Sequence, residues 1–353
     1  MYNSQIFYRE VYMSYTINLQ ASGHSFEAEE GEVILEAALR QGINFPYGCR
    51  SGTCATCLGN VISGELEYPE GLPLALMEHE YEAGKAIFCA SVAKSDMVID
   101  VKEVTSQLSI DVKLLPARVA SLKKLSDDVM QMKLSLPANE QLKFHAGQYI
   151  EFILADKSRR AFSLANAPTN NETLELHLRL VEGGKFTEHV FFQMKEKAIV
   201  RIEGPFGTFS ISEKSNRPLI LVAGGTGFAP IKSMVEQLIQ QGDSRPVHLY
   251  WGVQSQADLY LNEVAQAWDD KYDTLDYKPV LSKPSSADEK ENWQGRTGFV
   301  YEAVVNDFDS LAGFDVYMAG PPAMINASKK AFIEKGLPED QLFSDSFEFA
   351  KRA

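Results

Sequence analysis

Cysteine is scarce in this chain, and basic residues are few relative to acidic ones. Only 4 of the 353 residues are cysteine, too few for the disulfide framework of a secreted protein. No apolar run approaches the about eighteen residues that a membrane-spanning helix needs. Lys and Arg number 34 against 48 Asp and Glu, for a net charge of −14. That balance argues against binding to nucleic acid, which depends on clustered cations.

These deficits predict a soluble cytoplasmic protein without membrane or nucleic-acid partners. Residues 1–13 have no apolar core and no small-residue cleavage site, so they do not resemble a signal peptide. We treat them as an extension and assign them no function. The length suits two or three domains, each with its own core.

Three of the four cysteines share one Gly-rich loop. Cys49, Cys54 and Cys57 are separated by four and then two residues, and Cys89 follows alone. This is the spacing of plant-type [2Fe-2S] sites. Small residues in such a loop allow backbone amides to approach the sulfur atoms. A four-cysteine zinc site and buried free thiols are the alternatives, but zinc sites usually pair two short Cys-x-x-Cys knuckles. We therefore predict that the four cysteines ligate [2Fe-2S].

The residues around this loop have the pattern of a small α+β domain. Helical apolar spacing covers Glu32 to Gln41, and strand-like runs lie at 25–28, 58–62 and 97–101. The whole resembles the β-grasp ferredoxin fold over residues 14–105. This segment holds fourteen Asp or Glu against five Lys or Arg, so we expect it to suit a basic partner surface. A solvated acidic face without a partner stays open as the alternative.

The middle of the chain alternates with period two. Strand-like runs at 130–136, 147–154 and 174–181 predict a small antiparallel barrel. In the last run, four leucines alternate with Glu175, His177 and Arg179, so these polar residues share the face opposite the core. His177 and Arg179 can therefore address one ligand.

Short motifs flank that last strand. Arg160-Ala161-Phe162-Ser163 precedes it, and Gly183-Gly184-Lys185-Phe186-Thr187 follows it. Singly, a surface salt bridge and a hairpin turn would explain them. In this order they resemble the flavin-binding half of the ferredoxin–NADP reductase superfamily, with its Arg-x-Tyr-Ser and Gly-x-x-Ser/Thr elements, over residues 116–214.

This resemblance implies a bound FAD. On it, Arg160 pairs with the pyrophosphate, Phe162 packs on the isoalloxazine in place of the usual Tyr, and Ser163 bonds near N5. Thr187 lies at a helix start, where amides and the helix dipole suit a phosphate. The full set of implied FAD contacts is Arg160, Phe162, Ser163, His177, Leu178, Arg179, Gly184 and Thr187.

The last third changes to alternating strands and helices. A continuous apolar run, 218–223, suits a parallel strand buried on both faces. The Gly-rich turn Gly224-Gly225-Thr226-Gly227 leads from it into a helix, which is the geometry of a pyrophosphate site. Pro230 stands where the Rossmann fingerprint would have its third glycine.

Four motifs of this region occur in the order of the same superfamily: Gly225-Thr226-Gly227-x-Ala229-Pro230, Tyr250-Trp251-Gly252, Asp258-Leu259-Tyr260 and Gly320-Pro321-Pro322. The resemblance implies that NADH is held by Gly225, Thr226, Gly227, Pro230, Gly252, Gly320, Pro321 and Pro322. It also implies that Phe347 shields the flavin until nicotinamide displaces it, so Ser163 and Phe347 are the predicted catalytic residues. Ala319 replaces a Cys that many relatives have beside the nicotinamide, which predicts slower hydride transfer. Residues 253–258 contain no Arg or Lys for a 2′-phosphate, which predicts a preference for NADH over NADPH.

The complete layout predicts an α+β multidomain protein. We expect an extension (1–13), a β-grasp [2Fe-2S] ferredoxin domain (14–105), a linker (106–115), an antiparallel FAD barrel (116–214) and an α/β NAD(H)-binding domain (215–353). It resembles the reductase components of bacterial oxygenases, of the phenol hydroxylase and naphthalene dioxygenase types, and the CDP-6-deoxy-Δ3,4-glucoseen reductases.

The resemblance implies an NADH-dependent, monomeric reductase that sends single electrons through [2Fe-2S] to a partner protein. An oxygenase is the commoner partner of this layout, and a sugar dehydrase is the alternative. A free-flavin reductase would leave the ferredoxin domain idle. A non-catalytic redox sensor is a further alternative, and it predicts unchanged absorption spectra when NADH is added anaerobically.

Overall fold

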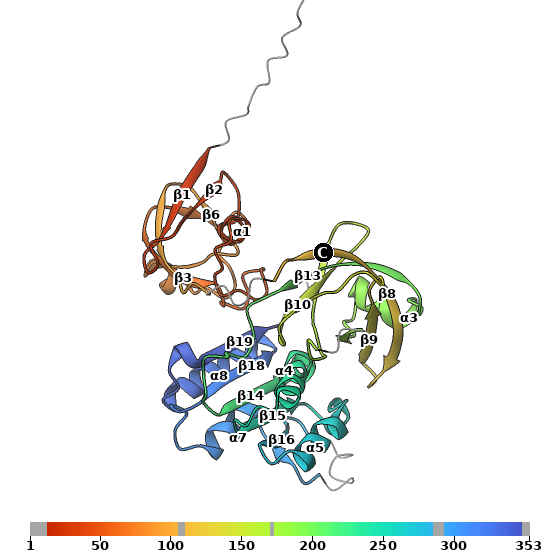
Figure 1. Cartoon of the computed structure of the whole chain (residues 1–353). Helices are drawn as coiled ribbons and strands as arrows, with labels where there is room; N and C mark the ends of the chain where they lie inside the picture. Colours follow the sequence, from red (N-terminus) through yellow and green to blue (C-terminus); the bar gives the residue numbers. More distant parts are fainter. Residues whose placement is uncertain (1–12, 105–109, 170–172, 285–292, 348–353) are drawn as a thin grey trace, which may run out of the picture. The chain divides into compact units, whose positions relative to one another are not determined.

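The structure is a computed structural model that describes residues 13–104, 110–169, 173–284 and 293–347 (Figure 1). The chain divides into two compact units, Met1–Gln107 and Leu108–Ala353. None of the helices in the described residues is long and apolar enough to cross a membrane. Each unit is described by itself below.

The first unit is a mixed five-stranded sheet with one main helix. The strand order is β2-β1-β7-β3-β5, with β1 and β7 parallel and the other neighbours antiparallel. Its elements are β1 (Ser14–Leu19), β2 (Ser25–Glu29), α1 (Ile34–Arg40), β3 (Leu58–Ser63), β4 (Leu66–Glu67), α2 (Glu78–Glu82), β5 (Lys85–Ile87), β6 (Val92–Ala93) and β7 (Met97–Asp100). The predicted ferredoxin fold is confirmed here.

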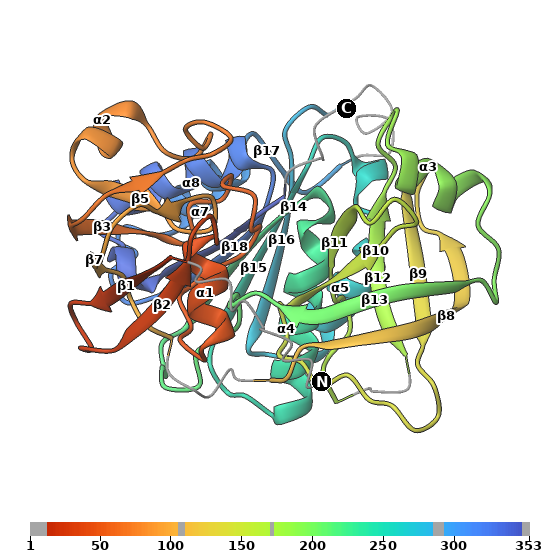
Figure 2. The same ribbon diagram turned by 90° about the horizontal axis from the view of Figure 1, so that it is seen from above.

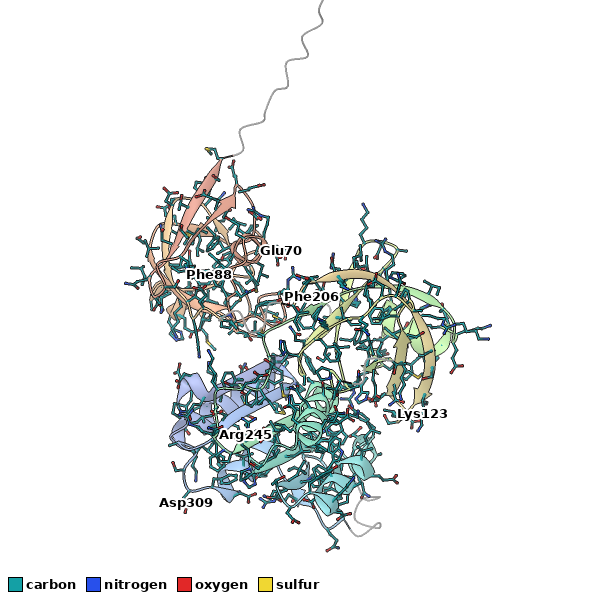
Figure 3. The ribbon with its side chains drawn as sticks, in the orientation of Figure 1. Glu70, Phe88, Lys123, Phe206, Arg245 and Asp309 are labelled. Carbon is teal, nitrogen blue, oxygen red and sulfur yellow. The ribbon has the colours of Figure 1, made fainter. Side chains whose placement is uncertain are left out.

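Aromatic packing links β2, the segment after α1 and the segment that carries Cys89. The ring of Phe45 lies 5.8 Å from that of Phe26 and 5.9 Å from that of Phe88, in edge and tilted arrangements that aromatic pairs prefer. All three side chains are buried, and Phe88 is labelled in Figure 3. Because Phe88 directly precedes Cys89, this packing fixes the position of the fourth cysteine.

The first half of the second unit is a six-stranded antiparallel sheet of order β11-β10-β13-β8-β9-β12. A bridge between Leu164 and Leu176 joins its two ends, which closes the sheet into the predicted barrel. The elements are β8 (Lys113–Lys124), β9 (Val129–Ser135), β10 (Tyr149–Ile153), β11 (Arg159–Ser163), β12 (Leu174–Arg179), α3 (Lys185–Phe192) and β13 (Ile199–Phe206). Leucines of β12 fill the barrel core, as the alternation predicts.

The first barrel strand begins before the predicted start of this domain. β8 starts at Lys113, so three residues of the predicted linker lie in a strand, and Pro116 lies within it. Pro116 pairs with Arg201 of β13, whereas β9 pairs with β8 only from Arg118 onward. Pro116 therefore has a neighbouring strand on one side only, which suits a residue that has no N–H to donate to a second strand.

The second half is a six-stranded parallel sheet of order β17-β16-β15-β14-β18-β19. Its strands are β14 (Leu219–Gly224), β15 (Val247–Val253), β16 (Leu275–Leu281), β17 (Arg296–Thr297), β18 (Asp315–Gly320) and β19 (Leu342–Ser346). Its helices are α4 (Phe228–Gln241), α5 (Asn262–Lys271), α7 (Val300–Asp307) and α8 (Pro322–Glu334), with 3-10 turns η2 (Gly225–Gly227), η3 (Gln256–Asp258) and η4 (Glu339–Gln341).

Helices cover both faces of this sheet. Side chains of α4 and α5 share one core with β14 and β15, and side chains of α7 and α8 share the other (Figure 2). The chain leaves β14 toward β15 on one side, and the later strand β18 lies on the other. Ligands of such sheets bind outside the carboxyl ends of the strands at this switch point. The fold therefore places a ligand site at the ends of β14 and β18.

Candidate functional site

The loop between α1 and β3 carries three of the four thiols of the first unit, and Cys89 follows β5. The N–H groups of Ser51 and Thr53 each lie 3.4 Å from Cys49 Sγ and donate to it. The hydroxyl of Thr56 donates to Cys54 Sγ at 3.1 Å. Donors aimed at sulfur are what an iron-sulfur cluster requires, because they stabilise thiolate charge.

The four thiols contact one another. Contact with Cys54 and Cys89 lowers the pKa of Cys49, whereas contact with Cys49, together with burial, raises the pKa of Cys54. Contact with Cys49 and Cys57 raises the pKa of Cys89. Four crowded thiols cannot all ionise unaided, and bound metal deprotonates coordinating thiols. Among the described residues, no three His, Cys, Asp or Glu side chains are arranged for a single metal ion, so the fit rests on the loop and its donors.

Left-handed backbone lets this loop fold around the sulfurs. Arg50, Gly52 and Ala55 have φ of 55°, 74° and 56°, a region that costs non-glycine residues free energy. Arg50 Nε and Nη2 donate to Glu36 Oε1 of α1 at 2.9 and 2.5 Å. A Cβ on Gly52 would lie 2.9 Å from Pro73 Cβ. The loop is thus supported by α1 on one side and by the segment around Pro73 on another.

β11 of the barrel carries three predicted FAD residues. The Phe162 ring lies 5.8 Å from that of Phe152 and 5.6 Å from that of Phe186, so it is partly packed on the barrel. Ser163 is buried at the end of the strand. Arg160 Nη1 donates to the carbonyl of the preceding residue at 2.7 Å. The strand brings an aromatic ring, a hydroxyl and a guanidinium together, which suits a flavin and its phosphates.

The start of α3 forms a compact turn. Thr187 Oγ1 accepts a hydrogen bond from the Val181 N–H at 3.1 Å and donates to the Gly184 carbonyl at 3.2 Å. A Cβ on Gly184 would lie 2.7 Å from that hydroxyl. Gly184 is the N-cap and makes no side-chain capping bond. The first backbone amides of α3 therefore suit a phosphate, as the resemblance implies.

The outward face of β12 contacts protein groups of the NAD half. His177 is buried, with Nδ1 3.1 Å from the Tyr260 hydroxyl and Nε2 3.0 Å from Glu175 Oε1. Arg179 Nε donates to Asp128 Oδ2 at 2.6 Å. The alternation thus predicts the face, and the contacts present are with protein; that these residues also contact FAD stays a prediction. Leu178 lies on the inward face, in the barrel core.

Glycines bring β14, β18 and η2 unusually close together. A Cβ on Gly227 would overlap the Ala319 carbonyl, and one on Gly320 would lie 3.0 Å from Gly224 Cα. Gly225 has a φ of 54°. A pyrophosphate can approach this backbone closely because no side chain stands in the way. The geometry fits a dinucleotide at the switch point of the sheet.

The other predicted nucleotide residues lie around the same ends of β14 and β18, which we call the nucleotide rim. Pro230 is in the first turn of α4, Pro321 is the N-cap of α8, and Pro322 opens that helix. A Cβ on Gly252, near the end of β15, would lie 2.7 Å from Val300 Cβ. The structure thus brings these residues together with Gly225, Thr226, Gly227 and Gly320.

Two further residues define the surroundings of this rim. The N–H of Phe347, after β19, donates to the Gly320 carbonyl at 3.0 Å, and its ring is partly buried against the NAD-half core. In η3, Asp258 Oδ2 accepts from the N–H and hydroxyl of Ser255 at 2.9 and 3.0 Å. Phe347 therefore lies beside the predicted nicotinamide residue Gly320, and a carboxylate lies in the loop that is predicted to face the 2′-position of the nucleotide.

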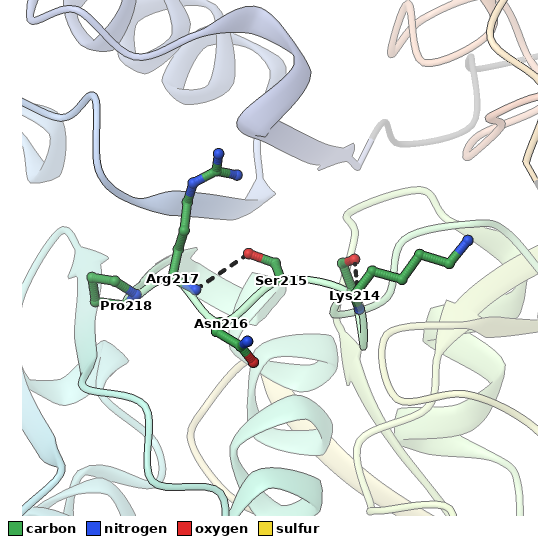
Figure 4. Close-up of a pocket in the computed structure, with 6 residues that line it drawn as sticks. Lys214, Ser215, Asn216, Arg217 and Pro218 are labelled. Atoms are coloured by element: carbon green, nitrogen blue, oxygen red, sulfur yellow. Dashed lines mark hydrogen bonds between the residues drawn. The ribbon is translucent and has the colours of Figure 1, made fainter.

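One open hollow lies outside these sites. It measures about 680 Å³ and is lined by Ser212 and residues 214–218, between β13 and β14 (Figure 4). Within its lining, the hydroxyl of Ser215 accepts from the Arg217 N–H at 3.3 Å. It holds none of the predicted site residues.

Three residues that support the predicted sites could not be found from the sequence. Neither motif nor spacing singles out Glu36, Lys232 or Glu236, which support the sites from neighbouring helices.

Known proteins share this order of sites. The chain matches the 2Fe-2S iron-sulfur cluster binding domain over residues 17–94, the oxidoreductase FAD-binding domain over 116–211 and the oxidoreductase NAD-binding domain over 221–330. It is 40% identical over 335 residues to CDP-6-deoxy-L-threo-D-glycero-4-hexulose-3-dehydrase reductase of Yersinia pestis, covering 95% of this chain and 99% of that protein. The chain belongs to the family of three-domain [2Fe-2S], FAD and NAD reductases.

Other members of this reductase family have different partners. The chain is 36% identical over 339 residues to the reductase component of phenol 2-monooxygenase from Pseudomonas sp. strain CF600, covering 95% of each protein. The crystal structure of the Amycolatopsis cytochrome P450 reductase superposes with a TM-score of 0.77 at 30% identity, covering 94% of this chain and 98% of that one.

Family membership decides between the readings of the cysteine loop. The first domain holds [2Fe-2S] rather than zinc, and the chain is an NADH oxidoreductase that moves electrons from NAD(P)H to FAD and then to the cluster. FAD, when bound, accepts a hydride and releases single electrons. The chain's own residues supply binding and orientation, since no acid or base is needed for hydride transfer.

Proposed function

We propose that this reductase delivers single electrons to an oxygenase component. The observation that supports this most is the ordered set of sites, with a nucleotide rim, a flavin barrel and a cluster loop in one chain. The Pseudomonas relative is the reductase component of phenol 2-monooxygenase. A protein partner explains why the chain has a ferredoxin domain, since a flavin alone could reduce small acceptors.

A second candidate partner is a sugar dehydrase. The dehydrase reductase of Yersinia pestis has the higher identity, 40% against 36% for the phenol 2-monooxygenase reductase. That difference favours the dehydrase, although the cofactor sites serve either partner equally. Both candidates require the same electron path through the chain.

Reconstitution with purified partners tests both candidates. We expect reductase that has been loaded anaerobically with FAD and [2Fe-2S] to oxidise NADH slowly when alone. The rate should rise at least about tenfold with its true acceptor and that acceptor's substrate, because the acceptor takes electrons from the cluster. Oxygenase-dependent hydroxylation supports the first candidate, and loss of a sugar hydroxyl supports the second. NADH oxidation that responds to free flavin but to neither protein would contradict both.

The predicted roles of individual residues form part of this proposal. Cys49, Cys54, Cys57 and Cys89 would hold the cluster. Arg160, Phe162, Ser163, Gly184 and Thr187 would hold FAD, and Gly225, Thr226, Gly227, Gly252 and Gly320 would hold NADH. Phe347 would cover the flavin face until nicotinamide arrives.

An apolar patch beside the cluster loop would receive the acceptor. This docking patch consists of Leu72, Leu74 and Met77, whose exposed fractions are 43%, 72% and 64%. Pro73, within it, is the residue that a Cβ on Gly52 of the cluster loop would meet. Apolar side chains exposed together often mark protein interfaces. The patch therefore offers a contact surface close to the cluster.

The charge around this patch suggests the chemistry of the partner. Glu70, Glu78 and Glu82 are exposed along the same segment, and Glu70 is labelled in Figure 3. Complementary charge accelerates encounter and excludes wrong partners. We expect an acceptor with an apolar centre and a rim of Lys and Arg.

Cytochrome c, a basic electron acceptor, is a usable probe of this patch. Leu74→Ser combined with Met77→Ser should lower kcat/KM for cytochrome c reduction by about fivefold, and Ile62→Ser, an exposed change on β3, should not. NADH-dependent bleaching of the cluster should be unchanged. If bleaching slows instead, the patch meets the protein's own flavin half and the docking proposal is wrong.

A further inference from the structure

The three outward-facing residues of β12, which alternate with its leucines, contact the NAD half of the second unit. Glu175 lies 3.3 Å from Lys232 Nζ of α4, His177 contacts Tyr260, and Arg179 Nη1 lies 2.8 Å from the position of a Cβ on Gly225. In Figure 1, α4 lies between the parallel sheet and the barrel. One strand of the flavin barrel thus contacts the Gly225–Gly227 turn (the nucleotide loop), helix α4 and the segment that holds Tyr260.

The centre of this contact is buried and charged. Lys232 Nζ donates to Glu236 Oε1 at 2.6 Å and to the Ala165 carbonyl at 3.0 Å, and its side chain is only 8% exposed. Glu236 Oε2 accepts from the Ala167 N–H at 3.1 Å. Buried charges of this kind require their partners, because an unpaired one is strongly destabilising.

These bonds attach α4 directly behind the predicted flavin residues. Ala165 and Ala167 follow Ser163 by two and four residues, and the Ser233 hydroxyl donates to the Asn166 carbonyl at 2.7 Å. Four residues before Lys232, α4 begins at Phe228, right after Gly227. A shift of α4 would therefore move the nucleotide loop relative to Ser163.

A second route runs through aromatic side chains. The His177 ring meets the Tyr260 ring edge-on at 5.3 Å, and Tyr260 meets Trp251 edge-on at 5.1 Å. Trp251 Nε1 donates to the Gly225 carbonyl at 3.0 Å. This connects β12 to the nucleotide loop without passing through α4.

We propose that Lys232, Glu175 and His177 are positioning residues for hydride transfer. With Glu236 and Tyr260 they form the β12–α4 polar cluster, which fixes the Gly225–Gly227 loop against the flavin strands. This inference rests on the proposal that the loop holds the NADH pyrophosphate. A reacting atom displaced by about 1 Å can cost about a hundredfold in rate, so a fixed contact here affects chemistry rather than affinity.

The charges of the cluster predict how strongly each variant should disturb the contact between β12 and α4. Lys232→Met leaves Glu236 without its lysine partner and Glu175 with only the more distant Lys133, whereas Glu175→Gln leaves the Lys232 and Glu236 pair intact. The double variant removes one charge of each sign and should be less damaged than Lys232→Met alone. Lys133→Met is a matched control, because half-buried Lys133 lies 3.8 Å from Glu175 Oε2 but belongs to β9 rather than to α4 or the Gly225–Gly227 loop.

The test is anaerobic stopped-flow reduction of the holoenzyme flavin by NADH and by NADH deuterated at the transferred position. We expect Lys232→Met to lower the limiting rate at least about tenfold and to raise the isotope effect. The NADH concentration that gives half of the limiting rate should change less than about threefold, and the FAD content should stay normal. Glu175→Gln and the double variant should fall in between, and Lys133→Met should match the parent.

Hydrogen–deuterium exchange of the same proteins gives a readout independent of turnover. The amides of residues 225–236 should exchange faster in Lys232→Met and normally in Lys133→Met. Unchanged exchange in Lys232→Met, or an unchanged limiting rate, would overturn the positioning role. If exchange rises as expected while a Gly227→Ala change leaves NADH reduction intact, the nucleotide-loop proposal fails instead.

Discussion

At the scale of single residues, missing Cβ atoms shape the nucleotide rim. A methyl group on Gly227 would meet the Ala319 carbonyl, one on Gly320 would meet Gly224 Cα and Met324, and one on Gly224 would meet the side chains of Pro321 and Met324. Backbone contacts cannot be relieved by rotating a side chain, so the strand ends would have to separate. The glycines therefore act through space rather than through flexibility.

Gly227→Ala tests this point. We expect kcat/KM for NADH to fall by about a hundredfold, because the added Cβ would push η2 away from Ala319. Gly313→Ala is the control, since a Cβ there meets nothing within 4 Å. Steady-state ferricyanide reduction measures both. Normal turnover in Gly227→Ala would contradict a close-packed rim.

Titration of the buried polar cluster predicts acid sensitivity. Burial lowers the pKa of His177 below its ordinary 6.5. Burial raises the pKa of Glu175, but the hydrogen bond to His177 and the charge of Lys232 outweigh it, so the pKa of Glu175 lies below its ordinary 4.5. The groups facing His177 are Glu175 on its own strand, Lys232 and Glu236 on α4, and Tyr260.

Both shifts have the same sign for stability. The unfolded chain binds a proton at His177 below pH 6.5 and at Glu175 below pH 4.5 more readily than the fold does, so stability falls as the pH drops through these ranges. We expect the melting temperature of the flavin-containing unit to fall by a few degrees between pH 7.5 and 5.5. His177→Gln should flatten this part of the curve. A steeper fall in that variant would contradict the assignment.

At the scale of elements, spacing and alternation predict position better than contact. The cysteine spacing predicts the cluster loop, and the period-two pattern predicts which residues of β12 face outward. It does not predict that the NAD half covers that face, because alternation distinguishes two faces without specifying what lies against either. Lys232 and Glu236 form an ordinary i,i+4 helix pair in the sequence, and their partners outside α4 lie 57 to 69 residues away.

The loop after β15 is the element that should govern nucleotide choice. The Gln254 carbonyl accepts from the Lys283 N–H at 2.9 Å, which holds the loop beside β16. Gln254→Arg should raise kcat/KM for NADPH about tenfold, because guanidinium binds phosphate well. Gln266→Arg, at an exposed position of α5, controls for added charge. Equal gains in the two variants would indicate a general charge effect.

At the scale of the whole molecule, the chain separates into two compact units. The sequence predicts the order of three domains correctly, but places the start of the barrel inside β8. Pro116 resembles a boundary residue, and only the sheet shows that one side of it lacks a partner strand. Local patterns cannot reveal which neighbour a strand has.

The division into units predicts how activities separate. A fragment of residues 108–353 should bind FAD and reduce ferricyanide with NADH at a rate within about threefold of the full chain. It should lose nearly all cytochrome c reduction, because the cluster is absent. Equal cytochrome c activity in fragment and full chain, measured at equal flavin content, would show that electrons leave from FAD directly.

The close contact of the β14 and β18 ends has a practical consequence for redesign. Mutant libraries intended to change coenzyme use would gain little at Gly227 and Gly320, where a Cβ would meet backbone atoms, or at Gly224, where it would meet Pro321 and Met324. Diversity is better placed at residues 254–258, which follow β15 and lie outside the strands. A selection restricted to that short window should yield altered coenzyme use while keeping the flavin loaded.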